Sequence, residues 1–351
     1  PTRRSSDLCK IYNIKVIRRT AVLYNFIFYN DSFKELDRLF FLDIEDYSNV
    51  KIVKRDKLFK SKIINFLCKC HLSHRINSKI NLPLKWIWYK ALFKNDFSTN
   101  KTLCFVFTPG WYYPEFFDYL KKKFKKSKFV FYFSDTIESK LKAIPSLDIN
   151  YLKENFDVVL SYNPQDVEKY NLKYTSIYYS KMPKSWLESL PKYENVDVLF
   201  IGAARNRLSE IKHAYHRLTN ADLKCFFYVV CNSEKNKLRD EGILYSKSAM
   251  SFNEYIGRTM STKCILEIVD NNTAGCTLRF WEAIMYNKKL ITNYTGVKNN
   301  IFYNPLYMQY FTSVENIVTS FVTEKNDVFY NYKGENSDRK STRLNSSHPL
   351  D

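Results

Sequence analysis

Residues Lys263 to Asn293 read KCILEIVDNNTAGCTLRFWEAIMYNKKLITN and decide the predicted fold. Their pattern predicts a strand, a polar loop with one glycine, a helix over Thr277 to Asn287 and a second strand. A helix that follows a strand of a parallel sheet begins at the carboxyl edge of that sheet, where phosphorylated ligands bind. This stretch therefore predicts an anion-binding site in an α/β protein.

The predicted helix turns one apolar face toward the sheet. With about 3.6 residues per turn, that face comprises Leu278, Trp281, Ile284 and Met285. A neighbouring stripe is formed by Arg279, Glu282 and Tyr286. We expect the stripe to border the core without lying in it.

The start of this helix offers free backbone N–H groups at Gly275, Cys276 and Thr277. A diphosphate placed there would meet the positive end of the helix dipole together with Arg279. Glu282, one turn further on, would accept hydrogen bonds from ribose hydroxyls. The alternative interpretation is that Arg279 and Glu282 form an ion pair on a solvated face.

Strand and helix patterns alternate through most of the chain. The first half predicts strands at 102–108, 128–135 and 156–163, helices at 114–124 and 164–170, and a short strand near Ile177. The second half predicts a strand and turn in VDVLFIGAARNR, 196–207, then a helix at 208–218 and a strand at 224–231. Such alternation requires crossover connections, so we predict an α/β fold with two Rossmann-like domains facing a central cleft.

The domain limits follow from the same patterns and from the two ends of the chain. The opening PTRRSSDL and the closing DRKSTRLNSSHPLD resemble translated sequencing-adapter DNA, so we set 1–8 and 338–351 aside as artefacts. Prolines near 183–191 mark a linker at 186–195. It separates an N-terminal domain over 9–185 from a C-terminal domain over 196–337, which we expect to be truncated.

Composition restricts the class of protein. An apolar content of 45% excludes a wholly disordered chain, and no stretch of about 18 uncharged apolar residues occurs. The formal net charge of +19 is spread along the sequence. That charge favours contact with anionic lipid surfaces or phosphorylated substrates, and it also motivates an alternative hypothesis of nucleic-acid binding.

Metal and cofactor signals are weak. Cys68, Cys70, His71 and His74 cluster, but the segment is predicted to be helical, and their spacing cannot point all four side chains at one ion. The turn after Gly202 lacks the pattern GxGxxG, so a dinucleotide is not indicated. We predict no metal site and no cofactor.

The block GCTLRFWEAIMYNKKLITN, 275–293, resembles the donor-binding motif of GT-B glycosyltransferases of bacterial capsule, exopolysaccharide and lipopolysaccharide synthesis. DVLFIGAARNR, 197–207, and NIFYNP, 300–305, resemble the same group. The resemblance implies a GT-B architecture with a nucleotide-sugar donor in the second domain and an acceptor in the first.

The resemblance also implies roles for single residues. Glu282 matches the second glutamate of the Glu-x7-Glu motif, which holds the nucleotide ribose, whereas Ala274 stands where the first glutamate would be. Arg279 and the turn at 275–277 would hold the diphosphate. Arg205 or Arg207, after the Gly202 turn, would neutralise the leaving phosphate.

The implied reaction transfers a sugar to a surface-polysaccharide or lipid-linked acceptor without a metal, because positive charges and a helix dipole stabilise the departing diphosphate. If the enzyme inverts, Asp135 or Asp31 is the candidate general base. We expect a cytoplasmic protein in peripheral contact with the anionic inner face of the plasma membrane, with no specific nucleic acid. The alternative functions are a non-catalytic nucleotide- or sugar-binding relative and a basic nucleic-acid-binding protein.

Overall fold

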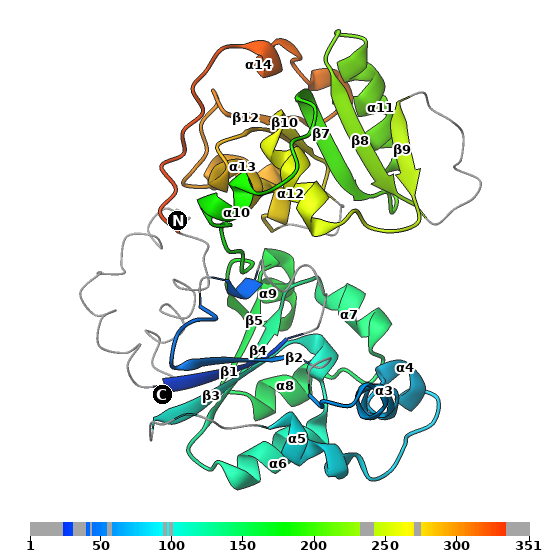
Figure 1. Ribbon diagram of the computed structural model, residues 1–351, viewed down its shortest axis with the longest axis vertical. Helices are drawn as coiled ribbons and strands as arrows, with labels where there is room; N and C mark the ends of the chain where they lie inside the picture. The colour runs from blue at the N-terminus through cyan, green and yellow to red at the C-terminus, as the bar shows by residue number, and fades with distance from the viewer. Residues whose placement is uncertain are drawn as a thin grey trace.

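The protein consists of two α/β domains, one above the other in Figure 1. The computed structural model describes residues 24–30, 40–42, 44–54, 58–93, 97, 101–231, 242–269 and 275–334. Each domain contains a six-stranded sheet whose paired strands all run parallel. The predicted fold class, α/β with two Rossmann-like domains, is confirmed.

The sheet of the first domain has the strand order β2-β1-β3-β4-β5-β6. Its strands are β1 (Tyr24–Asn30), β2 (Val50–Lys54), β3 (Thr102–Phe107), β4 (Lys128–Phe133), β5 (Val158–Ser161) and β6 (Lys173–Tyr174). The order reverses between β1 and β3, so two neighbouring strands there lead to connections on opposite sides of the sheet. In open α/β sheets the crevice outside such a pair is where ligands bind.

Helices cover both faces of this sheet. They are α3 (Lys62–His71), α4 (His74–Asn77), α5 (Tyr89–Leu92), α6 (Pro114–Lys123), α7 (Ile137–Ala143), α8 (Ile149–Asn155) and α9 (Pro164–Tyr170), with 3-10 turns η3 (Lys85–Trp88) and η4 (Pro109–Trp111). Proline stands at the first turn of α6 and of α9, where its missing N–H costs no helical hydrogen bond. These two helices begin where the sequence predicted them.

The second sheet has the order β12-β11-β10-β7-β8-β9. Its strands are β7 (Val196–Ala203), β8 (Cys225–Val230), β9 (Ile243–Ser246), β10 (Thr262–Glu267), β11 (Lys289–Thr292) and β12 (Met308–Tyr310). Counted from β7, this is the 3-2-1-4-5-6 order of a dinucleotide-binding Rossmann sheet, read from its other edge. Its reversal point lies between β7 and β10.

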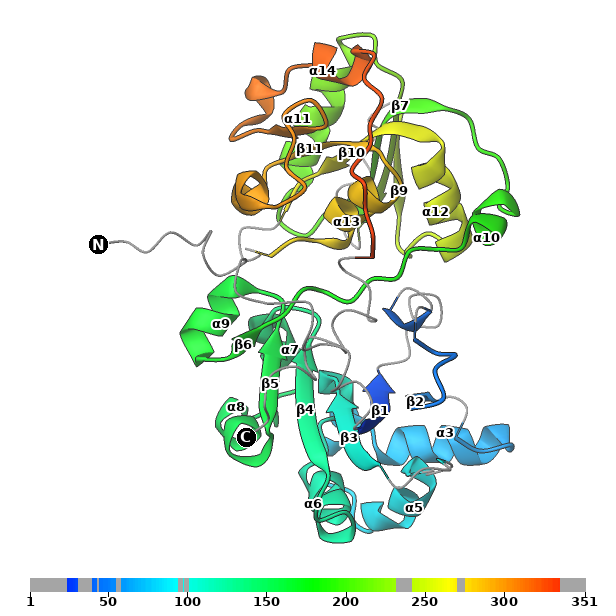
Figure 2. The same cartoon turned by 90° about the vertical axis from the view of Figure 1, so that its left-hand side faces the viewer.

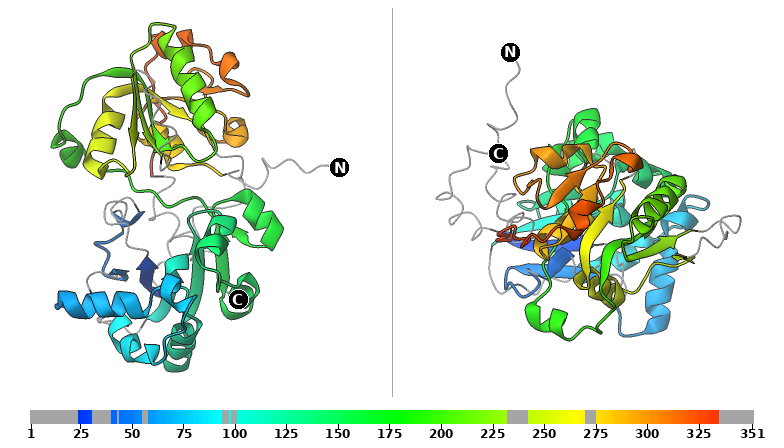
Figure 3. Two further views of the ribbon diagram at one scale, coloured as in Figure 1. Left: turned by 90° about the vertical axis from the view of Figure 1, so that its right-hand side faces the viewer. Right: turned by 90° about the horizontal axis from the view of Figure 1, so that it is seen from above.

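The second sheet is also covered on both faces. Its helices are α10 (Lys184–Glu188), α11 (Leu208–Thr219), α12 (Phe252–Met260), α13 (Leu278–Met285) and α14 (Ser320–Thr323), with 3-10 turns η6 (Thr295–Asn299) and η7 (Val314–Asn316). Figure 3 shows α11 against one face and α12 against the other. Helix α13 packs on the same side as α12, in a cluster that includes Ile256, Ile265 and Trp281.

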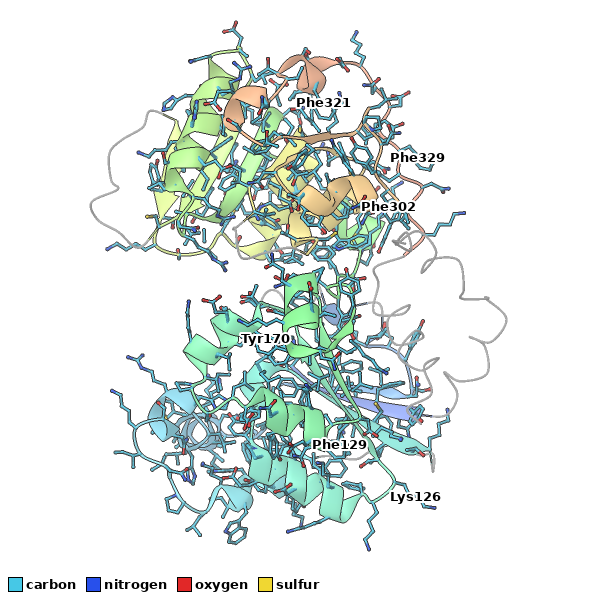
Figure 4. The ribbon with its side chains drawn as sticks, turned by 180° about the vertical axis from the view of Figure 1, so that it is seen from behind. Lys126, Phe129, Tyr170, Phe302, Phe321 and Phe329 are labelled. Carbon is cyan, nitrogen blue, oxygen red and sulfur yellow. The ribbon has the colours of Figure 1, made fainter. Side chains whose placement is uncertain are left out.

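Each domain buries its own core, because both faces of each parallel sheet are covered. In β4, Phe129 and Phe131 pack in one cluster, while Val130 and Tyr132 pack in the cluster on the opposite face. Figure 4 labels Phe129 in this domain and Phe321 in the other. The near-continuous apolar runs that predicted these strands therefore fit their burial on both faces.

One predicted strand is wrong. The expected strand near Ile177 is absent from the described segment, and the last strand of the first sheet is instead β6, Lys173–Tyr174. Further along, the Tyr178 N–H donates to the Tyr132 hydroxyl at 3.3 Å. This N–H is satisfied by a side chain and not by a neighbouring strand, because the chain is here leaving the sheet to join the second domain.

Candidate functional site

The predicted site lies at the reversal point of the second sheet. Strands β7 and β10 are neighbours that pair Val198 with Cys264 and Leu199 with Ile265. Their carboxyl ends, Ala203 and Glu267, therefore reach the same edge, and α13 follows β10 in the chain. An anion bound at this edge would face the N-terminus of α13.

Gly202 and Arg279, predicted separately, come together here. Arg279 Nε donates to the carbonyl oxygen of Ile201 at 3.0 Å, and the guanidinium carbon lies 5.5 Å from the centre of the Phe200 ring. A Cβ atom on residue 202 would collide with Arg279 Nη2. The glycine thus makes room for the guanidinium at the end of β7.

Glu267 organises the start of α13, and the sequence analysis did not select it. This carboxylate is fully buried, and it accepts hydrogen bonds from the hydroxyls of Thr277 and Thr292. The Thr277 hydroxyl also accepts from the Arg279 N–H at 3.2 Å and so caps the helix. Burial raises the pKa of Glu267, while the two threonine hydrogen bonds and the charge of Arg279 lower it.

Glu282 does not border the core as predicted; it is fully buried, and Tyr286 is buried as well. Its Oε1 accepts from the Tyr179 hydroxyl at 2.8 Å, and its Oε2 accepts from the Tyr255 hydroxyl. The alternative interpretation, an ion pair with Arg279 on a solvated face, is therefore also wrong. Helix α13 lies between the sheet and the chain that enters from the first domain, so this side of the helix is covered too.

The buried site of Glu282 changes its acidity. Burial raises the pKa of the carboxyl to about 7, although the tyrosine hydrogen bonds and the charge of Arg279 lower it. Sequence reasoning missed both tyrosines, since Tyr179 is 103 residues away along the chain. The ribose contact that the resemblance implies for Glu282 stays a prediction.

The turn before α13 contacts the first domain. A Cβ atom on Gly275 would lie 2.7 Å from the carbonyl oxygen of Tyr162, which follows β5, so only glycine fits this approach. Burial raises the pKa of the neighbouring Cys276 thiol to about 12. The thiol is therefore neutral, and this turn offers backbone groups and no thiolate nucleophile.

The two arginines after β7 differ in their surroundings. Arg207 Nη2 donates to the Ala203 carbonyl oxygen at 2.7 Å and Nη1 donates to that of Ile268, so its guanidinium bridges the ends of β7 and β10. Arg205 is exposed, in a left-handed backbone conformation with φ of 45°. Both lie on the turn that follows β7. We call the reversal point between the carboxyl ends of β7 and β10 the crossing point.

Asp135 lies in the short connection between the end of β4 at Phe133 and the start of α7 at Ile137. Its Oδ1 accepts from the Thr136 N–H at 2.9 Å, and its Oδ2 lies 3.4 Å from Lys140 Nζ. The N-cap of α7 is Thr136, so these contacts do not make Asp135 the cap of that helix, and its role as a general base stays a prediction. Asp31 and Ala274 lie outside the described residues.

A pocket occupies the reversal point of the first sheet, where β1 and β3 end. It has a volume of about 330 Å³, including space open to solvent, and its polar lining includes Asn30, Thr108 and Ser134. Tyr132 and Tyr178 line it as well, with ring centres 4.3 Å apart. The two rings stack on each other and are buried, so the amide and hydroxyl groups of the lining are the ones that could contact a polar ligand.

The cysteine and histidine cluster has structural contacts. His71 Nδ1 accepts from Trp88 Nε1 at 2.8 Å, and its Nε2 lies 2.7 Å from the Pro83 carbonyl oxygen. Within the ranges that the structure describes, no three His, Cys, Asp or Glu side chains are grouped so that they could hold a metal ion.

Comparison with known proteins gives similarity in structure alone. The chain matches no model of a protein family. No curated protein matches it in sequence either. An alpha-glucosyltransferase solved with UDP-glucose and DNA containing an abasic site superposes with a TM-score of 0.50 at 10% identity, covering 93% of this chain and 95% of that one.

Two further structures are similar over comparable lengths. UDP-N-acetylglucosamine 2-epimerase from Rickettsia bellii has a TM-score of 0.47 at 11% identity, covering 93% of this chain and 95% of its own. A UDP-forming alpha,alpha-trehalose-phosphate synthase from Burkholderia vietnamiensis has a TM-score of 0.45 at 9% identity, with 94% and 95% covered. Together with the two parallel sheets, the glucosyltransferase match shows that this chain has the two-domain α/β fold of the GT-B glycosyltransferases.

Proposed function

We propose that this protein is a glycosyltransferase that takes its sugar from a nucleotide diphosphate donor. The observation that carries the proposal is the crossing point of β7 and β10, where Gly202, Arg279 and the capped N-terminus of α13 converge. A guanidinium and a helix N-terminus together suit a diphosphate. Arg205 and Arg207 on the adjoining turn add positive charge for the leaving group.

The finer parts of the proposal rest on the resemblance of 275–293 to the donor motif. The acceptor is a glycan or a lipid-linked sugar of a bacterial surface polysaccharide, and the pocket between the ends of β1 and β3 is its binding place. Positive charge at the crossing point stabilises the departing diphosphate without a metal or cofactor. Asp135 and Asp31 remain the candidates for the general base.

A non-catalytic nucleotide-binding relative is the second candidate function. The observation that favours it is Glu282, whose two oxygens are already held by Tyr179 and Tyr255. A carboxylate bound in this way has less capacity for ribose hydroxyls. Binding of a nucleotide without turnover on any acceptor would support this candidate.

Arg279→Ala tests the donor site. We expect UDP or GDP to raise the melting temperature of the wild type by several degrees at saturating concentration, because ligand binding stabilises the folded state. Arg279→Ala should lose most of this shift, since it removes the charged fork at the crossing point. The measurement is thermal unfolding with a panel of nucleotides and nucleotide sugars, followed by release of nucleotide diphosphate.

The matched control is Arg217→Ala. Arg217, on α11 of the same domain, donates to the Ile317 carbonyl oxygen and not to the crossing point. Its nucleotide shift should equal that of the wild type. If no nucleotide shifts the wild-type melting temperature, or if both variants lose the shift equally, the donor site is not where we place it.

Gly202→Ala is a second test at the same place. The new methyl group must push the Arg279 guanidinium off the Ile201 carbonyl oxygen. We expect the affinity for UDP to fall about tenfold, corresponding to about 1.4 kcal/mol, while the unfolding free energy falls by only about 1 kcal/mol. Isothermal titration measures the affinity for UDP, and urea unfolding measures the unfolding free energy. Ala203→Ser, one residue further on, should leave both the affinity for UDP and the unfolding free energy nearly unchanged.

A further inference from the structure

The first domain carries a concentration of exposed apolar side chains. Among the described residues, sixteen large hydrophobic side chains are exposed, and nine of them fall between positions 63 and 87. These nine form what we call the apolar patch: Ile63, Ile64, Phe66, Leu67, Ile76, Ile80, Leu84, Trp86 and Ile87. An exposed group of this size on one segment indicates a surface that meets a partner.

The helix α3, which carries the first four residues of the patch, has a buried side and an exposed side. Cys68 on α3, and Leu72 directly after the helix, are buried in the core of the domain. Phe66 and Leu67, on the opposite side of the helix, are 65% and 53% exposed. Ser61 caps the helix by accepting from the Ile64 N–H.

The charge of the segment around the apolar patch indicates which kind of partner the patch contacts. Residues 57–95 contain nine lysines and arginines and no aspartate or glutamate. On α3, Lys62 and Lys69 are exposed beside the apolar side chains. Apolar side chains flanked by basic ones, with a tryptophan among them, match the boundary between lipid tails and anionic headgroups.

Two other partners fit less well. Nucleic acid without sequence preference is bound by aromatic rings that stack on bases, but seven of the nine patch residues are aliphatic. A second copy of this chain would bring two basic segments together, and like charges oppose that contact. An anionic bilayer satisfies both the apolar and the basic character.

Hydrogen bonds join the segment that carries the apolar patch to the turn that follows β3, beside the pocket of the first sheet. The Tyr113 hydroxyl donates to the Leu72 carbonyl oxygen at 2.6 Å, and His74 Nε2 lies 3.1 Å from the Gly110 carbonyl oxygen. In the same turn, Trp111 Nε1 donates at 2.7 Å to the carbonyl oxygen of Asn30, which lines the pocket. Figure 2 shows α3 along the outer side of the lower domain.

We propose that the apolar patch docks the protein on an anionic lipid bilayer. Nowhere in the described part of the chain is there a helix long and apolar enough to cross a membrane. The contact we propose is made from one side of the bilayer, by side chains of α3, α4 and η3. It goes beyond the proposed function and would bring a lipid-linked acceptor to the pocket between β1 and β3.

Vesicle flotation tests the docking surface. Wild-type protein is mixed with vesicles of phosphatidylcholine alone, or with about one third phosphatidylglycerol, and recovered from a density gradient. The test variant carries Phe66→Ser, Leu67→Ser and Trp86→Ser. The matched control carries Ile301→Ser, Leu306→Ser and Phe329→Ser, three second-domain side chains that are 73%, 53% and 64% exposed.

We expect the wild type and the control to float with anionic vesicles, less so at high salt, and to bind neutral vesicles weakly. The test variant should bind anionic vesicles about tenfold more weakly or worse, because three side chains no longer enter the lipid. Its melting temperature and its nucleotide shift should match the wild type, since all three replaced side chains are exposed. These two readouts separate loss of docking from loss of the fold or of the donor site.

Three results would overturn the proposal. The first is a wild type that does not float with anionic vesicles. The second is a test variant that floats as well as the wild type. The third is a wild type that forms a dimer or binds duplex DNA, together with a test variant that loses this dimer or DNA binding but binds anionic vesicles as well as the wild type does. Failure of the nucleotide shift in every protein would reject the donor site and leave the docking result standing.

Discussion

Replacing Glu267 with alanine is expected to lower the unfolding free energy by about 3 kcal/mol, through loss of a buried acceptor shared by several donors. In the wild type, the Thr277 and Thr292 hydroxyls both donate to this carboxylate. Alanine leaves both hydroxyls without that acceptor, the one on Thr292 fully buried, and opens a cavity beside them. Urea unfolding followed by circular dichroism measures the loss.

The effect should reach the donor site as well. The Thr277 hydroxyl, oriented by Glu267, accepts the Arg279 N–H, and the Thr292 hydroxyl accepts the Tyr294 N–H at 2.9 Å. Glu267→Gln keeps the shape and one acceptor oxygen, so we expect about 1 kcal/mol of destabilisation. Its nucleotide shift should still be smaller than that of the wild type, because the start of α13 is less firmly held.

Glu254→Ala provides the comparison. Glu254 is partly exposed on α12 and pairs with Arg258 at 2.9 Å, four residues further on. Surface pairs of this kind contribute about 0.5 kcal/mol. If Glu267→Ala cost no more than Glu254→Ala, the buried carboxylate would not organise the site.

The sequence predicted the fold class because its strands are buried on both faces. Runs such as TLCFVFT and KFVFYFSD contain too few polar residues for a sheet with one solvated face, and helices separate them. The order of the strands could not be predicted, since pairing depends on contacts between segments far apart in the chain. Gly202 and Arg279 were therefore selected for separate reasons, and only the pairing of β7 with β10 shows that one makes room for the other.

The predicted site was incomplete for the same reason. Glu267 ends an apolar run, and a charge inside a buried strand was a signal that could have identified it. Its partner Thr292 is 25 residues away. For Glu282, helical periodicity gave the correct neighbours within the helix but not its burial. Periodicity describes one helix, whereas Tyr179 and Tyr255 come from two other segments.

Glu282 should make the stability of the protein depend on pH between about 4.5 and about 7. Its folded-state pKa of about 7 lies above the ordinary value of 4.5, so the folded protein holds this proton more tightly than the unfolded chain. The contribution to stability is fully present below pH 4.5 and is lost as the pH rises through 7. The loss amounts to about 3 kcal/mol across that window.

Glu282→Gln should remove this part of the pH dependence. Glutamine stays neutral, and its amide can accept from one tyrosine hydroxyl and donate to the other. Urea unfolding at pH 5, 6, 7 and 8 should show the wild type losing stability relative to the variant as the pH rises. Equal slopes for the two proteins would mean that Glu282 does not titrate in this range.

Tyr179→Phe sharpens the test, because the Tyr179 hydroxyl is one of the groups that lower the pKa of Glu282. Its removal should move the pH window upward. Tyr178→Phe, the adjacent control, should leave the window in place, since Tyr178 stacks on Tyr132 of the first sheet. These two consecutive tyrosines contact different domains. The Tyr178 N–H donates to Tyr132 of the first domain, and the Tyr179 hydroxyl donates to Glu282 of the second. We therefore expect the protonation of Glu282 to change how the connecting chain is held against α13.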